Sequence, residues 1–355
     1  MNWKNQLTQL FDIEYPIVQA PMLGVATPEM VAAAARTGIL GALPLGDLPA
    51  EKCIETIHAA RKLTDKTFAV NIFVHEIPEI SDSLINRYAE TKRFIERLAE
   101  RHHIDVSLPA IEDIKLTDYH DQIEAIIAEK CKIVSFTFGN MDAESIRKLK
   151  QCDTILIGTC TSVEEAVILE RSGVDLICAQ GIEAGGHRGN LNGNITPKIS
   201  GMSLLSRVYD HVSVPLIYAG GLYNGRTILA AKALGAQGFQ VGSLLLGSRE
   251  SALQEFEKQR LRKVDESDIV LTRSFTGRYA RGIKNTFIDA VEDSGYILPY
   301  PYQNKLTAGL RKIAKAAQNT DFASIWLGQS INGYSDRPTA EILRHLIEDT
   351  ERYEE

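Results

Sequence analysis

Several features that mark other classes of protein are missing from this chain of 355 residues. Its five cysteines form an odd set without a C-x-x-C pair, which argues against a disulfide framework and against a thiolate zinc site. The first residues lack the apolar core of a secretory signal, and no run of about 18 apolar residues could cross a membrane. A net charge of −7 supplies no basic field for nucleic acid or anionic lipid. We therefore predict a cytoplasmic protein that binds neither nucleic acid nor membrane.

The common motifs of nucleotide and metal chemistry are also absent. The sequence has no G-x-G-x-x-G, no Gly-Lys dipeptide of a P-loop, no G-x-S-x-G and no H-E-x-x-H. The eight histidines are scattered, apart from the adjacent His102 and His103, so we predict no metal site. Cys160 has no evident base beside it, and we interpret it as a buried core residue.

Short apolar segments alternate with helical patterns along the chain, which is typical of parallel β-α units. The sequence contains eight strand candidates of this kind: Pro16–Ala20, Ile39–Pro44, Phe68–Val74, Lys132–Phe138, Thr154–Gly158, Asp175–Ala179, Pro215–Ala219 and Gly238–Val241. Eight parallel strands predict an α/β fold of the TIM (β/α)8 barrel type.

Three of the intervening helices have clear sequence signals at their ends. Thr27 followed by proline predicts the start of the first helix, and Asn224 predicts the start of another. A capping box begins the helix after Ser162, which stops at Gly173. These units repeat one plan, as a barrel requires.

Three segments of the sequence are additional to the eight β-α units of a minimal barrel. Residues 75–129 predict a helical insertion after the third strand, and residues 182–201 form a long loop rich in glycine and asparagine. Residues 249–355 predict a mainly helical C-terminal extension. We expect this extension to pack on the barrel of residues 1–248 within one domain.

Glycines follow the seventh and eighth predicted strands, in Ala219-Gly220-Gly221 and in Gln240-Val241-Gly242-Ser243. In a barrel these two strands are neighbours, and their loops form the commonest phosphate site of the fold. Glycine lets backbone N–H groups approach phosphate oxygens, and the Ser243 hydroxyl can donate another bond. We predict a bound phosphate monoester here; the alternative is that the glycines only permit tight turns.

A glycine-rich run, AQGIEAGGHRG at residues 179–189, follows the sixth strand. It places His187 on the catalytic face, where an imidazole can act as a general base or a hydrogen-bond donor. Arg188 is either a contact for a substrate anion or a residue that pins the loop. The side-chain amides of Gln19 and Asn71, at other strand ends, suit the mixed edge of a heterocyclic ring. For Asn71 and Gln180 the alternative is that they bond the backbone of neighbouring loops.

Taken together, these motifs resemble the nitronate monooxygenase family, formerly called 2-nitropropane dioxygenases, and are close to its bacterial class I type. The resemblance covers nearly the whole chain. It includes Ala20-Pro21-Met22, the Ala-Gly-Gly-His run, Tyr300-Pro301-Tyr302-Gln303 and Trp326-Leu327-Gly328-Gln329. It implies an FMN-dependent enzyme that oxidises alkyl nitronates, such as propionate 3-nitronate, with O2 to a carbonyl compound and nitrite.

The resemblance also implies roles for individual residues. His187 matches the active-site histidine, which deprotonates neutral nitroalkanes where these are accepted. Tyr300 and Tyr302 are candidates to close the substrate pocket, or else pack the tail on the barrel. The implied FMN contacts, together with the predicted phosphate site, are Met22, Asn71, Gln180, Gly185, Gly220, Gly221, Gln240, Val241, Gly242 and Ser243.

Two other functions stay open on the sequence alone. An FMN-dependent enoyl-acyl carrier protein reductase, which uses NAD(P)H, shares the Ala-Gly-Gly-His run. A flavin-binding protein without turnover would retain FMN but would be reduced by neither NADH nor a nitronate. The donor that reduces the flavin distinguishes the three functions.

Overall fold

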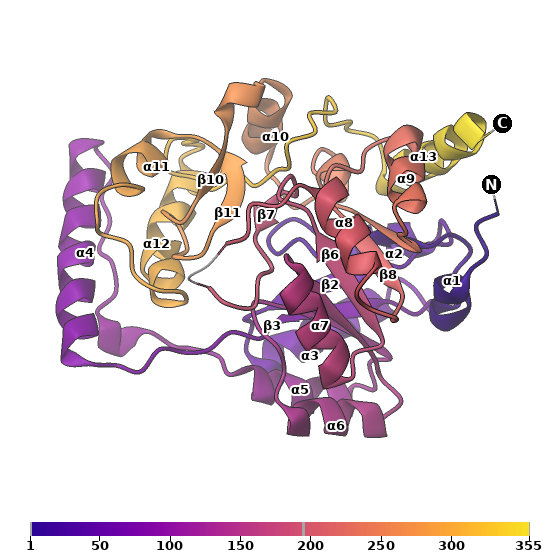
Figure 1. The fold of residues 1–355 in the computed structure, drawn as a ribbon. Coiled ribbons are helices and arrows are strands. Elements are labelled where there is room, and N and C mark those ends of the chain that lie inside the picture. Colours follow the sequence, from indigo (N-terminus) through magenta and orange to yellow (C-terminus); the bar gives the residue numbers. More distant parts are fainter. Residues whose placement is uncertain (1, 194–195, 355) are drawn as a thin grey trace.

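The structure, a computed structural model, describes residues 2–193 and 196–354 and contains a sheet of eight parallel strands (Figure 1). They are β1 (Ile17–Gln19), β2 (Ala42–Gly46), β3 (Ala69–Phe73), β4 (Ile133–Thr137), β5 (Ile155–Cys160), β6 (Leu176–Gln180), β8 (Leu216–Ala219) and β9 (Gly238–Val241). Their order in the sheet is β1-β9-β8-β6-β5-β4-β3-β2. A parallel bridge between Val18 in β1 and Leu40, just before β2, brings the two ends of the sheet together. The predicted barrel is therefore confirmed.

All eight predicted strands overlap observed ones. The second begins at Ala42 rather than Ile39, because Leu40 forms only the isolated bridge and lies outside the ladder with β3. Strands β2 and β8 are buried along their whole length, as expected where both faces of a parallel sheet are covered. The short helix α1 (Gln6–Phe11) contributes Leu7 and Phe11 to the core cluster that contains residues from several barrel strands.

Eight helices surround the barrel: α2 (Pro28–Ala35), α3 (Ala50–Arg61), α5 (Tyr119–Ala128), α6 (Ala143–Gln151), α7 (Val163–Ser172), α8 (Gly201–Tyr209), α9 (Gly225–Ala233) and α13 (Thr339–Glu354). The predicted caps of α2 and α9 are confirmed. The Thr27 Oγ1 accepts from the Met30 N–H at 3.1 Å, and the Asn224 Oδ1 accepts from the Thr227 N–H at 3.0 Å.

The cap of α7 differs in one detail from the predicted capping box. Ser162 Oγ accepts from the Glu165 N–H at 3.2 Å, as expected. The Glu165 carboxylate, however, accepts from the N–H of Thr161 at 2.6 Å and from the N–H of Leu191 at 2.8 Å. The carboxylate therefore joins the start of α7 to the long loop after β6, in addition to capping the helix.

Two ring helices lie inside segments that the sequence sets apart from the barrel. Helix α13, within the predicted extension 249–355, packs on α9 and α2 and so takes the eighth helix position. Helix α5, within the predicted insertion 75–129, packs between α3 and α6. The parts outside the ring are therefore residues 74–118 and 246–338.

These two outer parts share a second hydrophobic core. The first part contains α4 (Asp82–Arg101) and the turn η1 (Ile111–Asp113). The second follows the turn η2 (Ser243–Leu245) and contains α10 (Glu255–Arg262), η3 (Glu266–Asp268), β10 (Ile269–Thr272), β11 (Ala280–Ile283), α11 (Thr286–Val291) and α12 (Tyr302–Ala316). Figure 1 shows α4 beside α11 and α12, away from the barrel. The shared core includes Tyr88 and Ile95 from α4 and Phe287 and Leu306 from α11 and α12.

A small antiparallel sheet connects this outer layer to the barrel. Its strand order is β10-β11-β7, where β7 (Gly186–His187) belongs to the loop after β6. Ala280 of β11 lies opposite His187 of β7. The backbone of the predicted catalytic residue is thus fixed by the extension.

Candidate active site

A cavity of about 450 Å³, here called the barrel-mouth cavity, lies at the carboxyl ends of the barrel strands. Residues of α12 and of the segment 324–332 complete its wall. Among the residues that sequence singled out, it is lined by Met22, Asn71, Gln180, Gly185, His187, Gly220, Gly221, Gln240, Gly242, Ser243 and Tyr300. The fold thus gathers at one cavity residues that the sequence spreads over 279 positions, from Met22 to Tyr300.

The glycines after β8 and β9 form an open backbone surface on this cavity. Gly220 and Gly221 have φ values of 128° and 69°, in the region that favours glycine. A Cβ at residue 221 would have no atom closer than 3.4 Å, so the space beside this backbone is free. Ser243 Oγ accepts from the Gly328 N–H at 2.8 Å, which leaves its own proton available for a ligand. This surface fits a phosphate group.

Glu183 brings a carboxylate next to the same glycines, and its charge is compensated. Its oxygens accept from the Gly201 N–H at 2.9 and 3.1 Å and from the Tyr218 hydroxyl. Arg281, whose Nε donates to the Ile182 carbonyl at 3.0 Å, interacts electrostatically with it. These contacts fasten the loop after β6 and limit the repulsion between Glu183 and a bound anion.

The two predicted amide side chains have different environments. Gln180 donates from Nε2 to the His187 carbonyl at 3.0 Å and accepts at Oε1 from the Gly189 N–H at 2.9 Å. Gln180 therefore holds the loop on both sides of His187. This matches the second interpretation given above, in which its amide bonds the backbone of a neighbouring loop. Asn71 donates from Nδ2 to Ser135 Oγ at 2.8 Å, and no described residue donates to its Oδ1.

His187 lies half-buried in the cavity wall between aromatic rings. Its Nε2 is 2.9 Å from Thr276 Oγ1, and the ring centroids of Phe138 and Trp326 are 5.3 and 5.6 Å away. Burial lowers the pKa of His187 to about 3, and the positive charges of Arg278 and Arg311 lower it further in the same direction. The imidazole is therefore neutral near pH 7, and one of its ring nitrogens has a free lone pair.

Helix α12 contributes a cationic wall that sequence reasoning missed. Arg311 Nη2 donates to the backbone carbonyl and to the Oδ1 of Asn304, both at 2.7 Å, and its Nε has no hydrogen-bond partner. No ion pair to Arg311 is found within residues 2–193 or 196–354; the Asp47 carboxylate interacts with it electrostatically but pairs with Lys305 at 2.7 Å. Burial lowers its pKa to about 10. The helical spacing of Asn304, Ala308, Arg311 and Lys315, all of which line the cavity, is the signal that could have identified this wall.

Tyr300 faces the same cavity with an unpaired hydroxyl. The side chain is buried, its Oη has no hydrogen-bond partner, and burial raises its pKa well above the usual value. Its ring packs against His75 and Phe138. The buried hydroxyl is thus a donor at the cavity wall without an acceptor among the described residues.

Five other residues from the sequence analysis lie outside the cavity. Gln19 is fully buried, donates from Nε2 to the Ala20 carbonyl and accepts at Oε1 from the Ala42 N–H at 3.1 Å. Val241 has its side chain in the barrel core, and its carbonyl accepts from the Ala20 N–H. The Tyr302 hydroxyl donates to the Pro78 carbonyl at 2.8 Å within the second core, so this residue packs the tail and does not close the pocket. Arg188 is fully buried and donates to two carbonyls of its own loop, which makes it a loop-pinning residue. Cys160 is a buried core residue.

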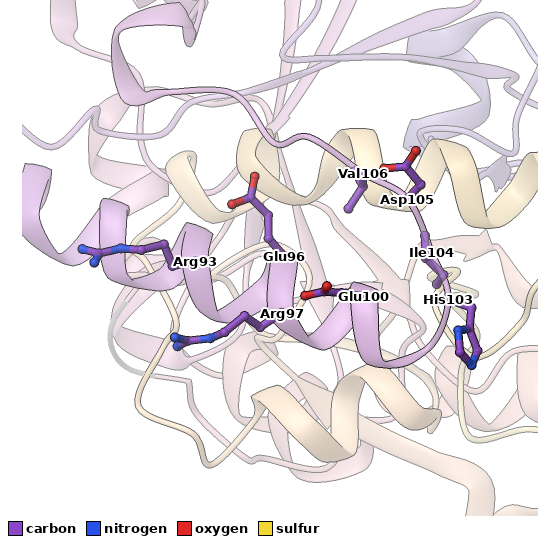
Figure 2. Close-up of a pocket in the computed structure, with 8 residues that line it drawn as sticks. All are labelled: Arg93, Glu96, Arg97, Glu100, His103, Ile104, Asp105 and Val106. Carbon is purple, nitrogen blue, oxygen red and sulfur yellow. The ribbon is translucent and has the colours of Figure 1, made fainter.

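A second cavity, of about 610 Å³, lies along α4 and the residues that follow it (Figure 2). This α4 groove is lined by Arg93, Glu96, Arg97, Glu100, His103, Ile104, Asp105 and Val106. Glu96 already pairs with Lys92 at 3.0 Å and accepts from the Leu108 N–H at 3.0 Å. The groove contains none of the candidate catalytic or cofactor-binding residues from the sequence analysis.

The fold and the barrel-mouth cavity define a (β/α)8 barrel with a small-molecule site at the carboxyl ends of its strands. A sequence model described as nitronate monooxygenase matches residues 4–349. A probable nitronate monooxygenase of Staphylococcus aureus (strain JH9) is 37% identical over 348 residues, which cover 97% of this chain and 96% of that protein. One from Staphylococcus haemolyticus (strain JCSC1435) is 36% identical over 353 residues, covering 98% and 97%. The chain therefore belongs to the nitronate monooxygenase family, whose members are flavin-dependent oxidoreductases.

Solved structures agree with this family assignment. The nitroalkane oxidase from Streptomyces ansochromogenes superposes with a TM-score of 0.87 at 32% identity, covering 99% of both chains. FabK from Thermotoga maritima superposes with a TM-score of 0.76 at 26% identity, covering 99% of this chain and 97% of that one. Within the described part of the chain, no helix has both the length and the apolar character needed to span a membrane.

Proposed function

We propose that this protein is an FMN-dependent nitronate monooxygenase that converts alkyl nitronates, such as propionate 3-nitronate, and O2 to a carbonyl compound and nitrite. One observation carries the proposal. A neutral imidazole, an arginine without an ion-pair partner among the described residues and a glycine surface suited to phosphate all face the same cavity. A base, an anionic substrate and a phosphate-bearing cofactor would each find a matching group there.

The residues present fit FMN. The backbone of Gly220, Gly221 and Gly242 and the Ser243 hydroxyl would bind its phosphate, and Met22 and Gly185 would line the ring. The amides of Asn71 and Gln240 would bond the polar ring edge, whereas Gln180 would support the loop and Val241 would contribute backbone only. Bound FMN supplies the redox chemistry, for which amino-acid side chains have no equivalent.

The substrate would bind through its negative charge. A nitronate is an anion with two oxygens, and the Arg311 guanidinium and Tyr300 hydroxyl are donors without competing acceptors on their free atoms. Hydrogen bonds to a charged group contribute about 1.5–3 kcal/mol each. A neutral nitroalkane must first lose the proton on its α-carbon, and the neutral His187 imidazole is available to accept it.

The alternative enzyme, an FMN-dependent enoyl-acyl carrier protein reductase, has weaker support. The FabK structure is 26% identical to this chain, against 32% for the nitroalkane oxidase. An enoyl reductase domain of MlnA from Bacillus amyloliquefaciens is only 12% identical and supports the fold alone. The reductase also requires NAD(P)H as reductant, which provides a direct test.

The test is an absorption spectrum of the purified protein followed by two anaerobic additions. We expect a yellow protein whose flavin bleaches on addition of propionate 3-nitronate and does not bleach rapidly with NADH. Rapid bleaching by NADH alone would favour the reductase, and bleaching by neither donor would favour a flavin-binding protein without turnover. A colourless protein that cannot be reconstituted with FMN would refute the cofactor assignment.

The proposed location is the cytoplasm. All five cysteines are free thiols, and four of them are buried. A chain with unpaired buried thiols suits a reducing compartment. Selective labelling of cells with a membrane-impermeant reagent, compared with labelling after lysis, would test the location.

A further inference from the structure

His187 is connected to a threonine of the extension through a short chain of hydrogen bonds. Its Nε2 lies 2.9 Å from Thr276 Oγ1, a residue 89 positions later in the sequence. The Thr276 hydroxyl is in turn 2.9 Å from the carbonyl oxygen of Arg278, to which it donates. Thr276 is 2% exposed, so water does not compete for these bonds.

The direction of these bonds determines which ring nitrogen has the proton. A hydroxyl has one proton, and Thr276 donates it to the Arg278 carbonyl, which has no other donor among the described residues. With this proton on the Arg278 carbonyl, Thr276 Oγ1, which also accepts from the Arg278 N–H at 3.4 Å, has only a lone pair to offer His187. A lone pair at this position matches the neutral tautomer with its proton on Nε2. No described residue forms a hydrogen bond with Nδ1, which retains its lone pair.

We propose that Thr276 is a positioning residue that holds His187 in the Nε2–H tautomer and makes Nδ1 the proton acceptor. This inference rests on the proposed function, in which His187 deprotonates neutral nitroalkanes. In that step the α-carbon C–H bond breaks and its proton moves to Nδ1. The bonding electron pair becomes part of the C=N bond of the nitronate anion, and the ring becomes an imidazolium that still donates from Nε2 to Thr276.

The surroundings of His187 restrict the position and orientation of the imidazole ring. Its backbone pairs with Ala280 of β11, and its carbonyl accepts from Gln180 Nε2 at 3.0 Å. The rings of Phe138 and Trp326 flank the imidazole. Packing therefore fixes where the ring lies, whereas Thr276 fixes which of its nitrogens can act as a base.

Two substitutions and one control test this role on the full-length, FMN-loaded protein. Thr276→Val keeps the shape and removes the hydroxyl, and Thr276→Ser restores it. Thr350→Val is the matched control, because the Thr350 hydroxyl is also buried and also donates to a carbonyl, that of Leu346 in α13, away from His187. The direct readout is the ¹⁵N NMR spectrum of protein with ¹⁵N-labelled histidine, in which the signal of His187 is identified by its loss in His187→Gln.

We expect wild-type protein, Thr276→Ser and Thr350→Val to have the His187 proton on Nε2, and Thr276→Val to shift it toward Nδ1. The kcat for neutral nitroethane should fall about 10-fold or more in Thr276→Val, since a positioned base contributes about 10²–10⁴-fold. Its KM should change little, and oxidation of preformed ethyl nitronate should be unaffected.

A wild-type spectrum with the proton on Nδ1 would overturn the proposal, and this measurement requires no variant to fold. An unchanged tautomer in a folded Thr276→Val would overturn it as well. If wild-type protein oxidises no nitronate at all, the proposed function fails, while the NMR result still decides the tautomer separately.

Discussion

The barrel-mouth cavity and the α4 groove differ more in the state of their polar groups than in size. Their volumes are comparable, about 610 Å³ for the groove and about 450 Å³ for the cavity. Its Glu96 already has an ion-pair partner and a backbone donor, and its arginines are exposed to water. In the cavity, by contrast, the Tyr300 hydroxyl and the Arg311 Nε are buried without partners.

This difference explains why volume is a poor guide to function here. A buried polar group without a partner costs about 1–3 kcal/mol of folding free energy. A ligand that supplies the partner recovers this cost on binding, whereas a ligand in the α4 groove would have to displace water or break existing bonds. The following predictions test this contrast, from the largest expected effect to the smallest.

Gly221→Asp should abolish FMN binding. The new side chain would have space, since its Cβ would lie 3.4 Å from the nearest atom, but it would place a second carboxylate beside Glu183 and against the phosphate. The measurement is the flavin content of the purified protein. Gly221→Asn is the matched control, because asparagine has the same size, tolerates the φ of 69° and has no charge. Retention of a full flavin complement in the aspartate variant would contradict the phosphate assignment.

His187→Ala should keep its FMN and lose most of its activity on neutral nitroalkanes. The phosphate residues are separate from His187, and loss of a general base costs about 10²–10⁴-fold in rate. Preformed nitronates need no base, so their oxidation should fall much less. Steady-state rates on nitroethane and on ethyl nitronate measure the two effects. An equal loss on both substrates would remove His187 from the role of base.

The protonation of His187 should differ from that of an exposed histidine. Burial first, and the charges of Arg278 and Arg311 second, lower its pKa to about 3. The pKa of exposed His120 is raised: burial acts to lower it, but hydrogen bonds to Asp142 and Asp118 outweigh this. A lowered pKa favours the neutral ring, so His187 should stay neutral at pH values where His120 is already charged.

NMR signals of the imidazole rings test this difference. The pH would be varied from about 8 to about 5, the range in which an ordinary histidine titrates. The His120 signal should move in the upper part of the range, and the His187 signal should remain constant. A midpoint for His187 near that of free histidine would mean that the cavity does not hold the ring neutral.

Arg97→Gln, in the α4 groove, should have the smallest effect. The side chain is exposed, and surface substitutions of this kind change stability by less than about 0.5 kcal/mol. Flavin content, kcat/KM for nitronate and the thermal unfolding midpoint should all match wild-type protein. A clear loss of activity would show that the groove takes part in function.

The sequence was sufficient to predict the barrel and much of the cavity, because both depend on local signals. Glycines after two neighbouring strands and a histidine after a third can be located once the strands are counted. The wall from α12 could not be located in this way. Arg311 lies on α12, whose buried apolar residues belong to a different core from the barrel strands, and its approach to the cavity depends on how 74–118 and 246–338 pack on one another.

Gln180 shows the same difference between what local sequence signals predict and what depends on tertiary packing. Its position at the end of β6 is predictable, but its two bonds to the backbone at His187 and Gly189 depend on the path of the loop. Likewise, the pairing of β7 with β11 joins segments about 95 residues apart, a separation at which local patterns contain no information.

The position of α13 has a consequence for biosynthesis. The last helix of the ring follows the outer layer in the chain, and contacts from Trp3 to Glu351 and from Gly225 to Asp349 fasten it to the amino-terminal end and to α9. On the ribosome the barrel would therefore lack one helix until α13 is synthesised. Cofactor capture should then follow synthesis of α13, and a protein shortened to residues 1–248 would lose one helix of the ring and the α12 wall of the cavity.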